Sequence, residues 1–149
     1  MEDINEKAAV ILLAEDDPGD QELTRRALAE GKIKNTLHIV ENGEEALDYL
    51  FRRGKYSDPK SSPWPDLFLL DLNMPKVDGR NVLQQLKDRP DLPHLVIVVL
   101  TTSSQEEDIL RTYNLGIKSF ITKPVDFGQF TKIIHALEDY WFQIVVLPK

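Results

Sequence analysis

The chain has 149 residues, no cysteine and a formal net charge of −7. This length fits one domain with a full hydrophobic core, and a chain without cysteine has neither disulfides nor thiolate metal sites. The acidic balance argues against a nucleic-acid partner, no apolar run is long enough for a membrane span, and the polar start is unlike a signal peptide. We therefore expect a cytoplasmic protein with no nucleic-acid or membrane partner.

Apolar runs alternate with amphipathic stretches along the whole chain. The pattern predicts strands at 10–14, 36–40, 67–71, 95–100 and 118–121, and helices at 18–31, 43–54, 79–89, 105–115 and 126–142. Five such βα units predict an α/β fold with a doubly wound parallel sheet. We expect a single domain over 1–149, with its core at about 9–142, an apolar tail at 143–149 and no output domain.

Polar residues stand where the helices are expected to begin. Asp17 followed by Pro18 is typical of an N-cap with proline at the first helical position. Three further pairs have the spacing of a capping box: Asn42 with Glu45, Ser103 with Glu106, and Asp126 with Gln129. Segment 52–65 contains three prolines, three serines and one glycine and predicts a long loop, which fits a binding element or a tolerated insertion equally well.

Acidic residues follow two of the predicted strands. Glu15 and Asp16 come after the first strand, Asp71 ends the third, and Asn73 lies two residues further on. In a parallel sheet the carboxyl ends of strands meet at one edge, where open α/β folds bind their ligands. Clustered carboxylates resist ionising together, and a hard cation such as Mg²⁺ relieves their repulsion. The pattern predicts a divalent-metal site with Asp71 as a candidate phosphoryl acceptor.

The last two strands end in other polar groups. Thr101 and Thr102 end the fourth strand, and Lys123 followed by Pro124 ends the fifth. Acids, a hydroxyl, backbone N–H groups and one ammonium are what phosphoryl transfer needs. Each residue also has a structural interpretation when taken alone: a turn for Asp71, a strand end for Thr101, or a surface position for Lys123. Asp17 is more typical of a helix cap than of a metal ligand.

Four motifs thus follow in order at the ends of the first, third, fourth and fifth predicted strands. With these motifs the chain resembles the receiver domain of two-component response regulators from Val10 to about Trp141. The resemblance implies a five-stranded sheet in the order 2-1-3-4-5. It implies that Asp71 is the phospho-acceptor in a Mg²⁺ site, where Mn²⁺ can substitute. The implied metal ligands are Glu15 through water, Asp16, Asp71 and the backbone carbonyl of Asn73.

The resemblance also gives roles to residues of the last two strands. Lys123 pairs with the phosphoryl group, Thr101 is the switch hydroxyl that bonds it, and Phe120 is the aromatic residue that changes conformation with Thr101. The peptide between Lys123 and Pro124 is expected to be cis, a state available mainly before proline. Thr102 flanks the phosphoryl group where the family usually has a smaller residue.

A narrower resemblance is to stand-alone regulators paired with bacterial and cyanobacterial phytochrome kinases. It is carried by segments 12–16, 70–75 and 99–103, the loop 56–65, and the aromatic end at 140–148. It implies a response regulator that receives a phosphoryl group from a sensor histidine kinase. Its output would run through protein contacts with a phosphotransfer or effector protein. The implied chemistry is limited to its own phosphorylation and dephosphorylation, so we do not expect an enzyme.

Three other functions fit the same sheet less well. A nucleotide- or flavin-binding module needs a phosphate-cradling loop, but Glu15, Asp16 and Asp17 would repel phosphate. A phosphatase with an aspartyl-phosphate intermediate usually has a second acid where Asn73 stands. A phosphorylation-independent interaction protein is disfavoured because no required group is missing.

The last predicted helix carries two apolar stripes. One stripe must pack on the sheet, and the other, with the apolar tail, is more apolar surface than a monomer usually exposes. We expect a homodimer, and the alternative is that the tail folds back onto its own domain. The expected interface comprises Phe130, Ile134, Leu137, Tyr140, Trp141 and Phe142.

Overall fold

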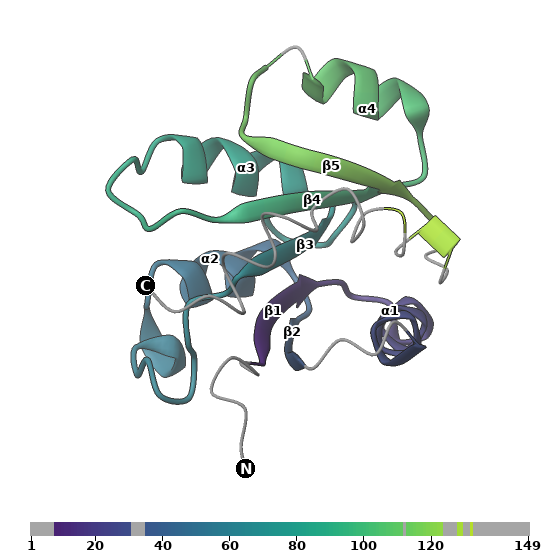
Figure 1. Cartoon of the computed structure of the whole chain (residues 1–149). Helices are drawn as coiled ribbons and strands as arrows, with labels where there is room; N and C mark the ends of the chain where they lie inside the picture. The colour runs from purple at the N-terminus through teal and green to yellow at the C-terminus, as the bar shows by residue number, and fades with distance from the viewer. Residues whose placement is uncertain (1–7, 31–34, 112, 124–127, 130–131, 133–149) are drawn as a thin grey trace.

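Apolar runs rich in valine, isoleucine and leucine form the strands of one parallel sheet (Figure 1). The computed structural model describes residues 8–30, 35–111, 113–123, 128–129 and 132. In these ranges five strands lie in the order β2-β1-β3-β4-β5, which confirms the predicted fold class and topology. The strands are β1 (Ala9–Ala14), β2 (Asn35–Val40), β3 (Leu67–Asp71), β4 (Val96–Thr101) and β5 (Ile117–Thr122).

The described helices lie on both faces of this sheet. They are α1 (Pro18–Glu30), α2 (Gly43–Leu50), α3 (Gly79–Lys87) and α4 (Ser104–Arg111), with a short 3₁₀ turn, η1 (Gly54–Tyr56). Figure 1 shows α1 on one side of the sheet and α2 and α3 on the other. Alternate strand residues therefore enter different cores: Leu12 and Phe68 pack with α2 and α3, whereas Ile11 and Leu69 pack with α1. All residues of β3 and β4 are buried, as expected for central strands of a doubly wound sheet.

Side-chain caps fix where three helices begin, as predicted. Each cap satisfies a backbone N–H of the first turn that has no partner within the helix. The hydrogen bonds run from Asp20 N to Asp17 Oδ2 at 2.8 Å, from Glu45 N to Asn42 Oδ1 at 2.8 Å, and from Glu106 N to Ser103 Oγ at 3.2 Å. Asp17 is therefore a helix cap. The fourth predicted cap, Asp126, lies outside the described residues.

Two helices end four residues earlier than predicted, next to residues with left-handed backbone conformations, and α3 ends at Lys87 instead of residue 89. The expected helix 43–54 ends at Leu50, and Arg52 and Gly54 have φ angles of 61° and 58°, which a right-handed helix cannot include. The expected helix 105–115 ends at Arg111, and Asn114 beyond it has a φ of 49°. An arginine rarely adopts the left-handed conformation, so the residue type at position 52 does not indicate that α2 ends there.

The predicted loop at 52–65 is anchored to the rest of the domain. The Tyr49 hydroxyl donates a 2.7 Å hydrogen bond to Pro63 O, and the Trp64 indole donates one of 3.0 Å to His94 O. Ser62 is buried. Because Trp64 and His94 precede β3 and β4, these anchors lie near the amino ends of the strands, away from the carboxyl ends where ligands of such folds bind.

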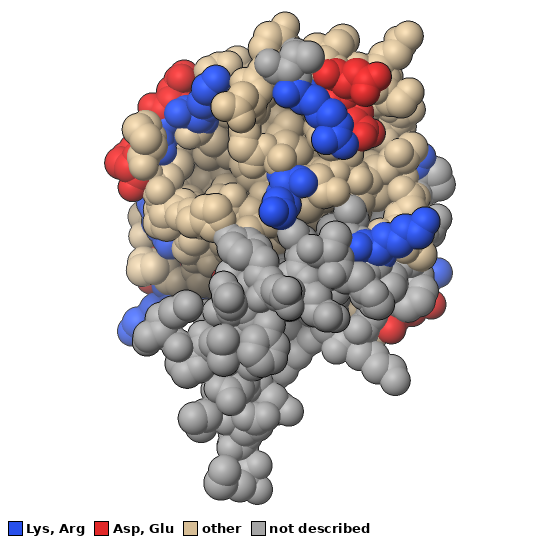
Figure 2. Space-filling model, turned by 45° about the horizontal axis from the view of Figure 1, so that its top comes forward, with Lys and Arg blue, Asp and Glu red and all other residues tan. Residues whose placement is uncertain are grey.

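Figure 2 shows a face that includes α4 and β5. In the part of this face that the structure describes, Lys and Arg side chains near its upper edges lie beside Asp and Glu side chains, and another lies among uncharged residues. Among the described residues, no helix is both long and apolar enough to cross a membrane. Pro124 and the predicted helix 126–142 lie largely or wholly outside the described residues, as do all six expected interface residues: Phe130, Ile134, Leu137, Tyr140, Trp141 and Phe142.

Candidate functional site

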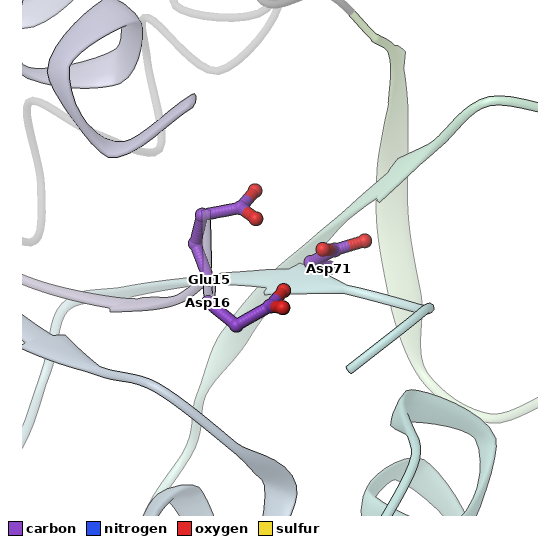
Figure 3. Close-up of side chains that lie close together, drawn as sticks. All are labelled: Glu15, Asp16 and Asp71. Atoms are coloured by element: carbon purple, nitrogen blue, oxygen red, sulfur yellow. The ribbon is translucent and has the colours of Figure 1, made fainter. Parts of the chain in front are cut away.

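The carboxyl ends of β1 and β3 bring three carboxylates together. In the parallel ladder Ala14 pairs with Leu70, so Glu15 and Asp16 continue β1 beside Asp71 at the end of β3. One carboxylate oxygen from each of these acids lies within 4.8 Å of one from each of the others. Figure 3 shows the three side chains directed toward one shared space. The structure thus assembles the acidic cluster that the sequence predicts.

Two of these carboxylates are buried. Glu15 is 1% exposed and Asp71 is 2% exposed, whereas Asp16 is exposed to solvent. The pKa of Glu15 is raised from 4.5 to about 7: burial raises it most, the hydrogen bond with Lys123 partly offsets this, and the charge of Asp71 raises it further. Negative charge in this cluster is therefore costly without a cation.

The cation supplied by the chain is Lys123 at the end of β5. Its ammonium donates a 3.0 Å hydrogen bond to Asp71 Oδ2 and lies 2.9 Å from Glu15 Oε1. Its backbone N–H donates to Thr101 O at 2.8 Å, which continues the pairing of β5 with β4 and aims the side chain at the acids. Burial lowers the Lys123 pKa, but the surrounding carboxylates outweigh burial and raise it. Lys123 is therefore charged throughout the physiological range.

A fourth acid, Asp20, also contacts this ammonium. Its Oδ2 lies 2.9 Å from Lys123 Nζ, although it belongs to the first turn of α1 rather than to a strand end. Sequence motifs do not identify Asp20, because no strand-end motif includes it. Its spacing from Asp17 is the one sequence feature that could have indicated it. A helix capped by Asp17 turns the side chains of its first turn toward the end of β1.

The acidic cluster fits a divalent cation. Within the described part of the chain, Glu15 Oε1 is buried without a hydrogen bond, although the Lys123 ammonium lies close to it. Three carboxylates on one side of the shared space match the oxygen ligands that Mg²⁺ and Mn²⁺ prefer. The Asn73 N–H donates to Asp71 Oδ1 at 3.1 Å, so the chain turns back over the site directly after β3.

The end of β4 is arranged differently. Thr101 is buried, and its Oγ1 accepts a 3.1 Å hydrogen bond from Ser103 N and lies 3.2 Å from Ser103 O. Glu106 in α4 pairs with Arg80 in α3, which ties the start of α4 to its neighbour. The Thr101 hydroxyl is thus engaged within its own loop, and Thr102 beside it is exposed.

Phe120 in β5 is half-buried at the edge of the core that contains α2 and α3. The guanidinium of Arg111 in α4 lies 4.7 Å from the centre of its ring, a cation–π geometry. Phe120 therefore connects β5 with α4.

These features coincide with a known family. Residues 11–135 match the response regulator receiver domain. The chain belongs to this family. It is a receiver-domain response regulator, and a curated relative, response regulator Rcp1 of Synechocystis sp., is 38% identical over 148 residues, which cover 99% of both proteins.

Solved structures of similar regulators share the fold. The bacteriophytochrome response regulator RtBRR is 42% identical with a TM-score of 0.80, over 87% of this chain and 78% of its own. The phosphorylated cyanobacterial phytochrome response regulator RcpA is 38% identical with a TM-score of 0.74, over 95% and 99%. The Mn²⁺-bound form of Rcp1 is 39% identical with a TM-score of 0.72, over 95% and 99%. The chain is thus homologous to phytochrome response regulators.

Proposed function

We propose that Asp71 accepts a phosphoryl group from a histidine of a sensor kinase, and that the chain acts as a single-domain response regulator over 1–149. The observation that carries this proposal is the contact of Asp71 with Lys123 beside two further carboxylates. A nucleophilic carboxylate, a fixed ammonium and a candidate metal site occur together at one sheet edge. This is the set of groups that phosphoryl transfer requires.

The transfer exchanges one bond to phosphorus for another. An oxygen of Asp71 bonds to the phosphorus while the bond to the kinase histidine breaks, and the electron pair of that bond returns to the imidazole nitrogen. Lys123 already contacts Asp71 Oδ2 and is positioned to neutralise the incoming oxygens. Mg²⁺, or Mn²⁺ in its place, would be held by Glu15, Asp16, Asp71 and the carbonyl of Asn73, and would neutralise phosphoryl charge.

The response runs through the end of β4 and β5. Thr101 exchanges its contacts with Ser103 for contacts with the phosphoryl oxygens. Phe120, whose ring lies beneath Arg111, moves together with Thr101. Thr102 flanks the phosphoryl group and limits attack by water. Because the phosphoryl group makes contacts only in the second conformation, it shifts the population toward that state.

The proposed partner is a phytochrome-type histidine kinase, by analogy with the similar phytochrome response regulators RtBRR and RcpA. The chain works in the cytoplasm, catalyses only its own phosphorylation and dephosphorylation, and passes its signal to a phosphotransfer or effector protein. We also propose a homodimer through Phe130, Ile134, Leu137, Tyr140, Trp141 and Phe142. Light scattering with and without beryllofluoride tests the dimer, and a monomer under both conditions would contradict it.

The decisive experiment is phosphorylation by a small donor, acetyl phosphate, in Mg²⁺, followed by mass spectrometry of the intact and digested protein. We expect one phosphoryl group on Asp71, loss of labelling in Asp71→Asn, and loss of labelling with a chelator. Asp78→Asn is the matched control, because Asp78 is an acid that caps α3 outside the cluster and asparagine is an equally good cap. Equal labelling of wild type and Asp71→Asn would overturn the proposal.

A further inference from the structure

The ammonium of Lys123 contacts two acids of the cluster, Glu15 and Asp71, and also Asp20, which lies outside the cluster. Its Nζ lies 2.9 Å from Glu15 Oε1, 2.9 Å from Asp20 Oδ2 and 3.0 Å from Asp71 Oδ2. A lysine ammonium has three N–H donors, and three carboxylates already surround it at hydrogen-bonding distance. A phosphoryl group on Asp71 brings further oxygens that need the same donors. The donor that Asp71 now accepts can pass to the phosphoryl group on that residue, so any further hydrogen bond from Lys123 to this group requires that Glu15 or Asp20 release the ammonium.

Burial decides which partner can leave. The Glu15 side chain is 1% exposed and the Asp71 side chain 3% exposed, whereas that of Asp20 is 26% exposed. A buried carboxylate that loses its cation carries a large desolvation penalty, but a carboxylate at the surface regains water. Asp20 also lies in the first turn of α1, where the helix dipole stabilises a negative charge without any ion pair. Asp20 is the partner whose release costs least.

We propose that Asp20 is a positioning residue that holds Lys123 in the unphosphorylated protein and competes with the phosphoryl group for its ammonium. This inference rests on the proposed function of Asp71. Asp20 stabilises the resting arrangement of the site, and so it weakens every ligand that needs Lys123. The coupling is reciprocal: a group bound on Asp71 draws Lys123 away from Asp20, and a stronger contact with Asp20 disfavours that group.

The same carboxylate also adds negative charge next to an incoming anion. Removing the charge of Asp20 should therefore strengthen anion binding for two reasons: it frees an N–H donor of Lys123, and it lowers the repulsion of the incoming anion. Asp20→Asn is nearly isosteric and keeps an oxygen toward Lys123, but without the charge. Asp20→Glu keeps the charge on a longer side chain and should stay close to wild type.

The test measures beryllofluoride affinity by fluorine NMR, and the rate of phosphorylation by acetyl phosphate, both in Mg²⁺. We expect Asp20→Asn to bind beryllofluoride about threefold to tenfold more tightly and to phosphorylate faster by a similar factor, since a charged hydrogen bond is lost only from the unbound state. Asp17→Asn is the matched control, because Asp17 caps the same helix, has the same charge and makes no ion pair with Lys123 among the contacts described. It should change both quantities less than about twofold, as expected of an exposed charge.

Each result has one meaning. If Asp20→Asn binds no more tightly than Asp17→Asn, or more weakly than wild type, Asp20 does not compete and the inference is wrong while the function of Asp71 stands. If Asp20→Glu behaves like Asp20→Asn, the effect comes from local packing, which also overturns it. If wild type and Asp71→Asn both fail to bind beryllofluoride and to accept phosphate, the proposed function fails and this inference fails with it.

Discussion

The acidic side of the site, formed by Glu15, Asp71 and Lys123, and the switch side, formed by Thr101 and Ser103, differ in their contacts. On the acidic side, Glu15 and Asp71 are buried and already meet Lys123 within 3.0 Å. On the switch side, Thr101 hydrogen-bonds within its own loop through Ser103. Under the proposed function, the acidic side is assembled before phosphorylation, whereas Thr101 would have to give up its contacts with Ser103 in order to respond.

This difference has a physical origin. On the acidic side, one ammonium only partly neutralises the negative charges of the carboxylates. Binding of a cation, or of a phosphoryl group together with its metal, is therefore electrostatically favourable there. The switch side has its hydrogen bonds satisfied, so it gains by moving only when a stronger acceptor is offered. Reception and response can therefore be altered separately, which the following changes test.

The largest effect on stability should come from Lys123→Met. The substitution keeps the length of the side chain but leaves buried carboxylates without their cation, so the free energy of unfolding in a chelator should fall by about 3 kcal/mol. Urea unfolding measures this change. Mg²⁺ should restore part of the loss, because a metal replaces the missing positive charge.

Lys76→Met is the matched control for that change. Lys76 pairs with Glu44 at 3.6 Å, and both side chains are more than half exposed. Exposed pairs of this kind contribute less than about 1 kcal/mol. If both substitutions cost the same, the acidic side is not held by Lys123 and the comparison of the two sides fails.

A smaller effect is expected on the switch side from Arg80→Gln. It removes the ion pair with Glu106 that ties α4 to α3, so the loop after β4 should open more often. Amide hydrogen exchange at Ser103 and Glu106 should accelerate by about twofold, since a half-exposed pair contributes on the order of 0.5 kcal/mol. Acidic-side stabilisation by Mg²⁺ should not change.

Arg26→Gln provides the comparison for Arg80→Gln. Arg26 pairs with Glu22 at 3.1 Å along the exposed face of α1, so its loss removes an equivalent charge away from the switch side. Exchange at Ser103 and Glu106 should then equal that of wild type. Faster exchange in both variants would point to a general loss of stability instead of a local tether.

Sequence patterns predicted the sheet and the acidic cluster because both depend on local order along the chain. Alternating apolar runs predicted the strands, the resemblance to receiver domains supplied their order, and a parallel sheet necessarily places Glu15 and Asp71 at one edge. Asp20 was missed because its contact depends on how α1 is turned relative to β5, which no local motif encodes. The end of α2 was missed because Arg52 adopts a left-handed conformation that its residue type disfavours.

The most direct test of this account is a structure with Mg²⁺ and beryllofluoride bound. We predict that Glu15, Asp16 and Asp71 keep their present arrangement, that Thr101 Oγ1 leaves Ser103 for the beryllofluoride, and that Lys123 leaves Asp20. A bound structure in which Thr101 still bonds Ser103, or in which the three acids have to rearrange before ligand can bind, would contradict it.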